Sequence, residues 1–214
     1  MSSPAGFNRE DIDIADVLGS SAMVGMYRGQ EVSNEIERLM DQAPGGTLVL
    51  FDIRKANPLQ YEFCHYAFGP LMRELGSDKW QEKHVIFQMH DYHRAGFFRG
   101  VLKHLGTELP RRESEEGFIQ RGFYCKLVLG DEESITFVGS LTDEQRRVLD
   151  LINHIKHATA RRLSDDLALP DEAVVYAVEF LVRKHFVAMQ GAPDDRRLLC
   201  YHSYCNYFQW GDLP

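Results

Sequence analysis

Hydrophobic positions in the first two thirds of the chain alternate between strand patterns and helix patterns. The clearest strand is 47–53, a near-continuous apolar run of the kind that lies at the centre of a sheet covered by helices. Strands are also predicted at 11–17, 84–89, 123–129 and 134–138, and helices at 29 or 31 to 40, 61–75 and 95–105. Gly76 and Gly106 follow two of these helices, in the position where glycine commonly ends a helix. The alternation predicts an α/β fold with a small mixed sheet.

The last third changes to helices followed by a hairpin. Thr142 and Gln145 have the spacing of a capping box, and the apolar stripe after them predicts a helix to about 155. A second helix is expected at 159–167, a turn at 168–171 because Pro170 disfavours helix in the residue before it, and a third helix after that turn. Two short strands, 186–189 and 198–201, flank the turn-rich segment 191–195.

The change of pattern divides the chain into two domains. At 214 residues the chain is long enough for two small cores. We expect an α/β domain over 1–140 and an α+β domain over 141–214.

The order of elements after residue 141 resembles the winged helix-turn-helix of bacterial MarR-like transcription regulators. The resemblance implies that the third helix is a recognition helix and that the segment 191–195 is a wing. The residues that it suggests for phosphate contact are Arg161, Arg162, Arg196 and Arg197. Those that it places nearest the base edges are Val175 and Tyr176. It also implies a homodimer that binds two half-sites of duplex DNA.

Charge favours an alternative function for the same domain. Its third helix opens with Asp171 and Glu172, and residues 141–214 hold nine Lys and Arg against eleven Asp and Glu. Binding to DNA draws much of its affinity from concentrated positive charge, which this domain lacks. A protein-interaction adaptor without DNA binding is therefore the second hypothesis.

Residues 11–106 resemble the STAS-like domains found beside bacterial regulators. The resemblance rests on Tyr27 to Glu31 opening a helix and on the buried strand LVLFDI, followed by a loop and an aromatic-rich helix. It implies a sensing or interaction domain, not a catalyst. In anti-sigma antagonists of this superfamily the loop carries a phosphorylatable Ser or Thr, but here residues 54–60 contain no hydroxyl.

Polar residues follow two of the predicted strands. Ligands of α/β sheets bind at the carboxyl ends of the strands, and we expect a ligand pocket there. It is formed by Asp52, Arg54, His90 and Arg94. A third hypothesis, a small-molecule enzyme, uses Asp52, His90 and His93. A metal site there would need Cys64 or His65 as a further ligand. A polar loop in which Asp91 caps the next helix is favoured over that metal site.

Other candidate chemistry finds little support in the sequence. Cys200 and Cys205 lack the second pair that a zinc ribbon needs, and no G-x-S-x-G, P-loop or dinucleotide-binding motif occurs. We therefore expect no enzyme activity, cofactor or metal. The aromatic segment 207–210 is expected to dock on the body of the protein or on a second subunit.

Composition adds limits on partners. The net charge of −8 argues against indiscriminate binding to nucleic acid or to anionic membranes. The chain has no apolar run long enough to span a membrane, its first ten residues do not resemble a signal peptide, and four cysteines do not suggest a disulfide framework. The expectation is a cytoplasmic regulator whose candidate partners are duplex DNA, a protein and a second copy of the chain.

Overall fold

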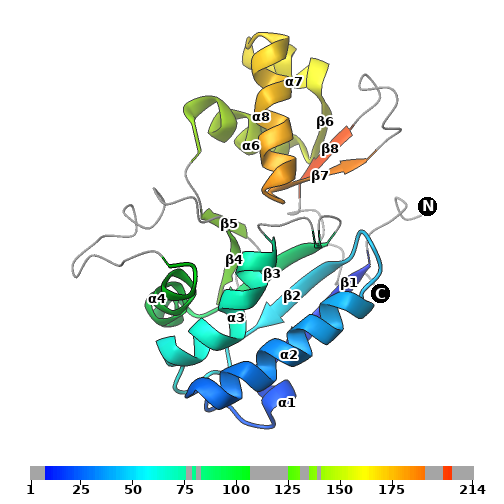
Figure 1. Ribbon diagram of the computed structural model, residues 1–214. Helices are drawn as coiled ribbons and strands as arrows, with labels where there is room; N and C mark the ends of the chain where they lie inside the picture. The colour runs from blue at the N-terminus through cyan, green and yellow to red at the C-terminus, as the bar shows by residue number, and fades with distance from the viewer. Residues whose placement is uncertain are drawn as a thin grey trace.

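The structure of the protein is a computed structural model, which describes residues 8–75, 79–80, 83–106, 125–130, 135–138, 141–190 and 200–203. Two groups of elements are present (Figure 1). The first contains β1 (Arg9–Asp13), α1 (Ile14–Leu18), α2 (Met26–Gln42), β2 (Leu48–Asp52), α3 (Tyr61–Leu75), β3 (His84–Met89), the 3₁₀ turn η1 (Asp91–His93), α4 (Arg94–His104), β4 (Cys125–Leu129) and β5 (Ile135–Val138). The second contains α6 (Asp143–Ile155), β6 (His157–Thr159), α7 (Ala160–Leu167), α8 (Asp171–Arg183), β7 (Val187–Gln190) and β8 (Cys200–Ser203).

The first group forms a five-stranded mixed sheet in the order β1-β2-β3-β4-β5. The first four strands are parallel to one another, and β5 is antiparallel to β4. Parallel crossovers are almost always right-handed, so strands that follow one another in sequential order leave their connecting helices on one side of the sheet. Figure 1 shows α2, α3 and α4 side by side over the same face. The expected α/β class with a mixed sheet is confirmed.

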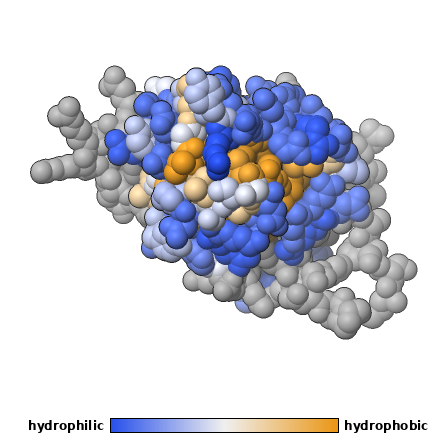
Figure 2. Space-filling view, turned by 90° about the horizontal axis from the view of Figure 1, so that it is seen from below, coloured by the Kyte–Doolittle hydropathy of each residue, from blue (hydrophilic) through white to orange (hydrophobic). Residues whose placement is uncertain are grey.

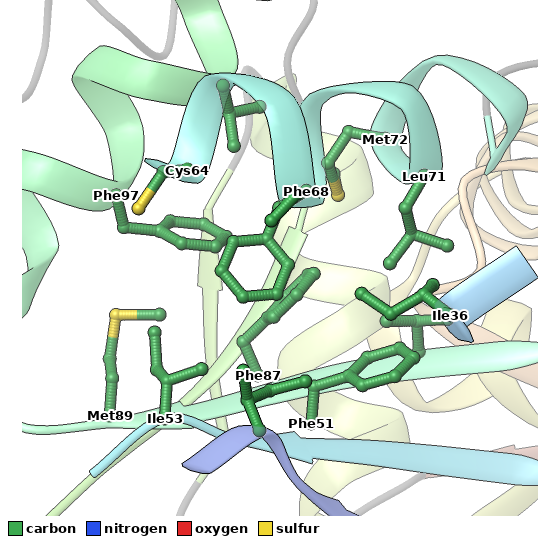
Figure 3. Packing of buried hydrophobic residues seen from close by; sticks show 14 of the residues in the cluster. Ile36, Phe51, Ile53, Cys64, Phe68, Leu71, Met72, Phe87, Met89 and Phe97 are labelled. Atoms are coloured by element: carbon green, nitrogen blue, oxygen red, sulfur yellow. The ribbon is translucent and has the colours of Figure 1, made fainter. Parts of the chain in front are cut away.

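The core under these helices is rich in aromatic residues. The Phe87 ring lies at the centre of the cluster, with ring centroids 5.8 Å from Phe51, 5.5 Å from Phe68 and 4.8 Å from Phe97. Figure 3 shows these four rings between the sheet and the helices, with aliphatic and sulfur-containing side chains around them. Strands β2, β3 and β4 contribute alternate residues to this core, as the two-residue period of a strand requires.

The other face of the sheet is also apolar. Its buried hydrophobic side chains come from β2, β3, β4 and β5 and are Leu48, Leu50, Ile86, Val128 and Ile135. They form one cluster with Ala188 of β7, and the ring of Phe137 lies 5.1 Å from that of Phe186. The described helices α2, α3 and α4 thus cover one face of the strand 48–52, whereas the expectation was a sheet covered by helices. The second group of elements packs against the other face.

That second group has its own core. Three helices enclose buried residues of which Val148, Leu163, Val178 and Phe186 are fully inaccessible. Strands β6, β8 and β7 form a three-stranded antiparallel sheet in that order. The capping box at the start of α6 is present, since the Thr142 hydroxyl accepts from Gln145 N and the Gln145 side chain accepts from Thr142 N. The helices predicted from 142, 159 and 171 are confirmed to within a residue or two.

Two local predictions differ from the structure. The strand expected at 11–17 ends at Asp13, whose carboxylate accepts from Ala15 N and Asp16 N and so starts a short helix there. The short strand β6 was not expected, because three residues are too few to show a periodicity and their pairing with β8 is made across the fold. Gly76, the wing segment 191–195 and the tail 207–210 lie outside the described residues.

Small residues let α3 and α4 approach closely. A Cβ atom on Gly100 would lie 2.2 Å from the Tyr61 carbonyl oxygen and 2.6 Å from the Cys64 Cβ. A Cβ on Gly96, one turn earlier on α4, would meet only the Leu59 carbonyl oxygen, at 3.3 Å. The two glycines therefore separate the effect of close packing from that of helix propensity.

We expect Gly100→Ala to destabilise the protein by about 1–3 kcal/mol or more, because the methyl group meets backbone that cannot move without separating two helices. Gly96→Ala should lie near neutral or be stabilising, since alanine is about 1 kcal/mol more favourable than glycine inside a helix. Urea denaturation of both variants measures the difference. Equal effects of the two substitutions would contradict the close approach of the helices.

Candidate functional sites

The polar residues predicted to line a pocket lie at the carboxyl ends of the parallel strands, but they have local partners. Asp52 ends β2, and its carboxylate accepts from the Arg54 backbone N at 2.9 Å and from the Arg54 guanidinium, with Nη2 2.7 Å from Oδ2. Both side chains are partly buried, which favours a fixed two-bond geometry. Asp52 and Arg54 thus pair with each other at the end of β2.

Asp13 and Lys55 form a second ion pair at the same edge. The Lys55 ammonium lies 2.6 Å from the Asp13 carboxylate. Burial alone would raise the pKa of Asp13, but the bond from Lys55 and those from Ala15 N and Asp16 N outweigh it and lower the pKa. The loop after β2 is therefore tied to the end of β1.

His90 and His93 have different surroundings. The His90 ring stacks on exposed Tyr92, with centroids 5.3 Å apart. His93 is buried, and its Nε2 lies 3.0 Å from the Ala56 carbonyl oxygen, which can only accept, so Nε2 carries the hydrogen. Burial lowers the pKa of His93, and the bond to Ala56 only partly opposes this. His93 therefore fastens the loop after β2 to η1.

Arg94 and Asp91 meet each other at the start of α4. The Arg94 Nη1 donates to the Asp91 carboxylate at 3.1 Å. The expected capping role of Asp91 is wrong, because the N-cap position of α4 is His93 and no side chain caps that helix. The carboxylate of Asp91 accepts from a side chain instead of from backbone N–H groups.

A hollow at this edge is lined by other residues. It has a volume of about 520 Å³ and lies between the starts of α3 and α4. Its lining residues are Leu59, Gln60, Tyr61, Glu62, Ala95, Gly96 and Arg99. The Arg99 guanidinium lies over the Tyr61 ring at 4.7 Å and the Lys103 ammonium at 5.3 Å. Sequence reasoning missed this hollow, because its two walls are 33 or more residues apart and meet only through helix packing.

The residues suggested as metal ligands are held elsewhere. Cys64 is buried in the core, where burial raises the pKa of its thiol, and the His65 ring packs against His104 with centroids 4.9 Å apart. Within the described ranges, no three His, Cys, Asp or Glu residues are grouped so that they could hold a metal ion. Cys205 lies outside those ranges.

The second candidate site is the outer surface of α7 and α8. Arg161 and Arg162 are exposed on α7, and the Arg162 Nε is 3.4 Å from the Asp166 carboxylate. On α8 the Tyr176 side chain is 71% exposed, whereas Val175 is partly buried. Arg196 and Arg197 lie outside the described residues.

Acidic side chains share this surface with the arginines. The exposed ones on the two helices are Asp165, Asp166, Asp171, Glu172 and Glu179. The turn between the helices is fixed by the Ser164 hydroxyl, which donates to the Leu169 carbonyl at 2.7 Å, and by Arg147, which donates to the Leu167 carbonyl at 2.8 Å. The surface is therefore well ordered and of mixed charge.

The opposite end of the molecule has a different character. Figure 2, seen from the side where α1 and α2 lie in Figure 1, shows a band of hydrophobic residues surrounded by hydrophilic ones. On α1, Val17 is 37% exposed. None of the helices in the described part of the chain combines the length and hydrophobicity needed to cross a membrane.

We expect His93→Ala to lower the free energy of unfolding by about 1–3 kcal/mol, since it leaves the buried Ala56 carbonyl without its partner. Tyr92→Ala, at a 73% exposed neighbouring position, is the control and should change stability by less than about 0.5 kcal/mol. Denaturant titration of both variants provides the comparison. A His93→Ala protein as stable as the control would show that the loop does not depend on this bond.

No protein-family model matches the chain, and a search of curated proteins finds no match either. What the two sites can do is therefore argued from their geometry and charge.

Proposed function

We propose that the protein is a two-domain regulator in which a winged-helix module, residues 141–214, binds duplex DNA under the control of a STAS-like domain, residues 1–140. The order of three helices, a short strand and a hairpin supports the winged helix. The helices on one side of a mixed sheet support a compact α/β partner domain. A homodimer that binds two half-sites is part of this proposal.

The observation that carries the proposal is the orientation of α8. Its buried residues Val174, Val178 and Leu181 face the module's own core, and Tyr176 faces solvent. The described contacts with the five-stranded sheet are made by His185, Phe186 and Ala188, after the helix has ended. The start of α8, the part that reaches base edges in helix-turn-helix proteins, thus lies far from the sheet (Figure 1).

Electrostatics sets a limit on affinity. The carboxylates of Asp171 and Glu172, in the first turn of α8, would lie near the DNA phosphates and be repelled by them. Cationic side chains would instead raise the affinity for DNA, because they release the counterions of the phosphates. The described cations best placed to offset this repulsion are Arg161 and Arg162 on α7. Binding should therefore be modest and should depend strongly on these two arginines.

We expect the double variant Arg161→Ala/Arg162→Ala to weaken binding to every duplex. It should also flatten the plot of log affinity against log salt, by up to about 0.9 for each phosphate that the protein no longer neutralises. Asp171→Asn/Glu172→Gln should strengthen binding. Fluorescence polarisation with a mixed-sequence duplex and with DNA from upstream of the protein's own coding sequence, at two salt concentrations, measures both effects.

The matched control is Arg38→Ala/Lys103→Ala, which removes the same charge from α2 and α4. If this control weakens binding as much as the α7 variant, net charge and not the α7 surface governs the interaction. Absence of binding by the unaltered protein at low salt would reject the DNA-binding proposal.

The second candidate function is a protein-interaction adaptor. It is favoured by one specific observation, the five exposed carboxylates that α7 and α8 carry together with the exposed Tyr176 ring. Such a surface suits a basic partner with an apolar contact at its centre, because aromatic residues are enriched at the cores of protein interfaces.

For that function we expect Tyr176→Ala to weaken capture of a partner, with a loss of affinity of about tenfold or more. Tyr27→Ala, which removes an equally exposed ring from α2, should leave capture unchanged. Quantitative pull-down followed by titration with the identified partner measures the two variants. If the Tyr176→Ala and Tyr27→Ala variants capture the partner equally well, Tyr176 is not part of the interface.

A further inference from the structure

A lysine is buried at the junction between the five-stranded sheet and the C-terminal module. Lys126 belongs to β4 and points from the face opposite α2, α3 and α4, since its neighbours Cys125 and Leu127 belong to the core under those helices. Only 2% of Lys126 is exposed. Removing a charged ammonium from water is unfavourable, so its environment determines when it carries a proton.

The C-terminal module supplies a hydrogen-bond acceptor for this lysine. The Lys126 Nζ donates to the His185 carbonyl oxygen at 2.5 Å, a bond between residues 59 positions apart. His185 has φ +57°, a left-handed conformation that is uncommon for residues other than glycine. The turn around it is fixed by His185 N donating to the Val182 carbonyl and Phe186 N to the Leu181 carbonyl.

A second histidine completes the cluster. His84 of β3 is also buried, and its ring centroid is 5.7 Å from that of His185. Apolar groups lie next to the cluster. Phe186 packs on Phe137, and Ala188 joins the cluster of Leu48, Leu50, Ile86, Val128 and Ile135. Among the described residues, three titratable side chains thus lie beside apolar ones at this junction.

We propose that Lys126, His84 and His185 form a proton-sensitive latch, in which proton uptake by these buried groups favours release of the C-terminal module from the sheet. The proposal concerns the junction only and does not depend on what α7 and α8 bind. Release would expose the apolar face of the sheet and would free the module to turn relative to the α/β domain.

The pKa values of all three groups are shifted in the same direction. Burial lowers the pKa of Lys126 to about 7, with a small opposing effect from the Cys125 thiol. Burial and then the charge of Lys126 lower the pKa of His84 well below its usual value. The pKa of His185 falls to about 4, through burial and through the charges of Lys126 and Lys184.

The direction of the pH effect follows from the difference between docked and released forms. Lys126 takes up its proton at about pH 10.4 when released, but near pH 7 when docked, so docking weakens as the pH falls from about 10 to 7. His185 and His84 take up protons near pH 6.5 when released and at lower pH when docked, so docking weakens again as the pH falls from about 6.5 to 4. One proton of difference corresponds to about a tenfold change in the docking equilibrium for each pH unit.

Two described residues next to the cluster, Cys125 and Lys184, do not reverse this direction. Among the described residues, Cys125 and Lys184 contribute to the electrostatics of Lys126 and His185. Burial raises the pKa of the Cys125 thiol, so it stays neutral over the pH range in question. The charge of Lys184 acts in the same direction as burial, since it further lowers the pKa of His185.

The first test measures the proton directly in the unaltered full chain. NMR of protein labelled at the lysine Cε positions should show one lysine that titrates near pH 7, and this signal should be absent from Lys126→Met. Lys126→Gln serves as a second variant if the methionine variant does not fold. A complete set of lysines titrating near their usual pKa of about 10.4 would overturn the proposal.

The second test measures release. Single-molecule energy transfer reports the distance between α2 and α8. The dyes are attached at Tyr27→Cys and Tyr176→Cys, in a protein in which Cys200 and Cys205 are replaced by serine. The ratio of docked to released molecules should fall about tenfold from about pH 9 to about pH 8 in the otherwise unaltered protein, and should not change over that range in Lys126→Met. Lys103→Met, which removes an exposed lysine, should behave like the unaltered protein.

Two outcomes would reject the latch. One is an identical pH profile for Lys126→Met and the Lys103→Met control. The other is loss of helical circular dichroism in step with the change in distance, because this would show that acid unfolds the protein and does not separate two folded parts. Retained helix signal with a pH-dependent distance would support release.

Discussion

The apolar second face of the five-stranded sheet governs how the parts of this protein are arranged. Sequential parallel strands leave their helices on one side, so the side chains of Leu50, Ile86 and Val128 need another cover. Leaving such a face in water would cost about 25 cal/mol for each Å² of apolar surface. The C-terminal module covers it through the segment from His185 to Ala188, and this contact determines which side of the module faces outward.

The two candidate sites follow from that arrangement. Because the module docks through residues just after α8, the helix itself extends away from the sheet and presents Tyr176 to solvent. At the carboxyl edge, by contrast, local ion pairs and the bond from His93 to Ala56 hold the loop after β2 in place. The surface of α7 and α8 is suited to an external partner, whereas the carboxyl edge of the sheet is a fixed scaffold beside a small hollow.

The junction also places polar groups where a core would ordinarily be apolar. A buried lysine and two histidines stabilise docking less than apolar residues of similar size would, since each must be desolvated. They also make docking sensitive to protons, which purely apolar contacts are not. A single chain can therefore combine a stable α/β core around Phe87 with a junction that responds to its surroundings.

Most helices and strands of this protein can be predicted from the sequence alone, because each shows its period over neighbouring residues. The helix 61–75 and the strand 84–89 have the bounds that the sequence predicts, and two residues are enough to indicate the Thr142 capping box. The same patterns do not reveal β6, the hollow between α3 and α4, or the bond from Lys126 to His185. Those features join residues that are distant in the chain and meet only after folding, and the burial and charge of each residue depend on what packs against it.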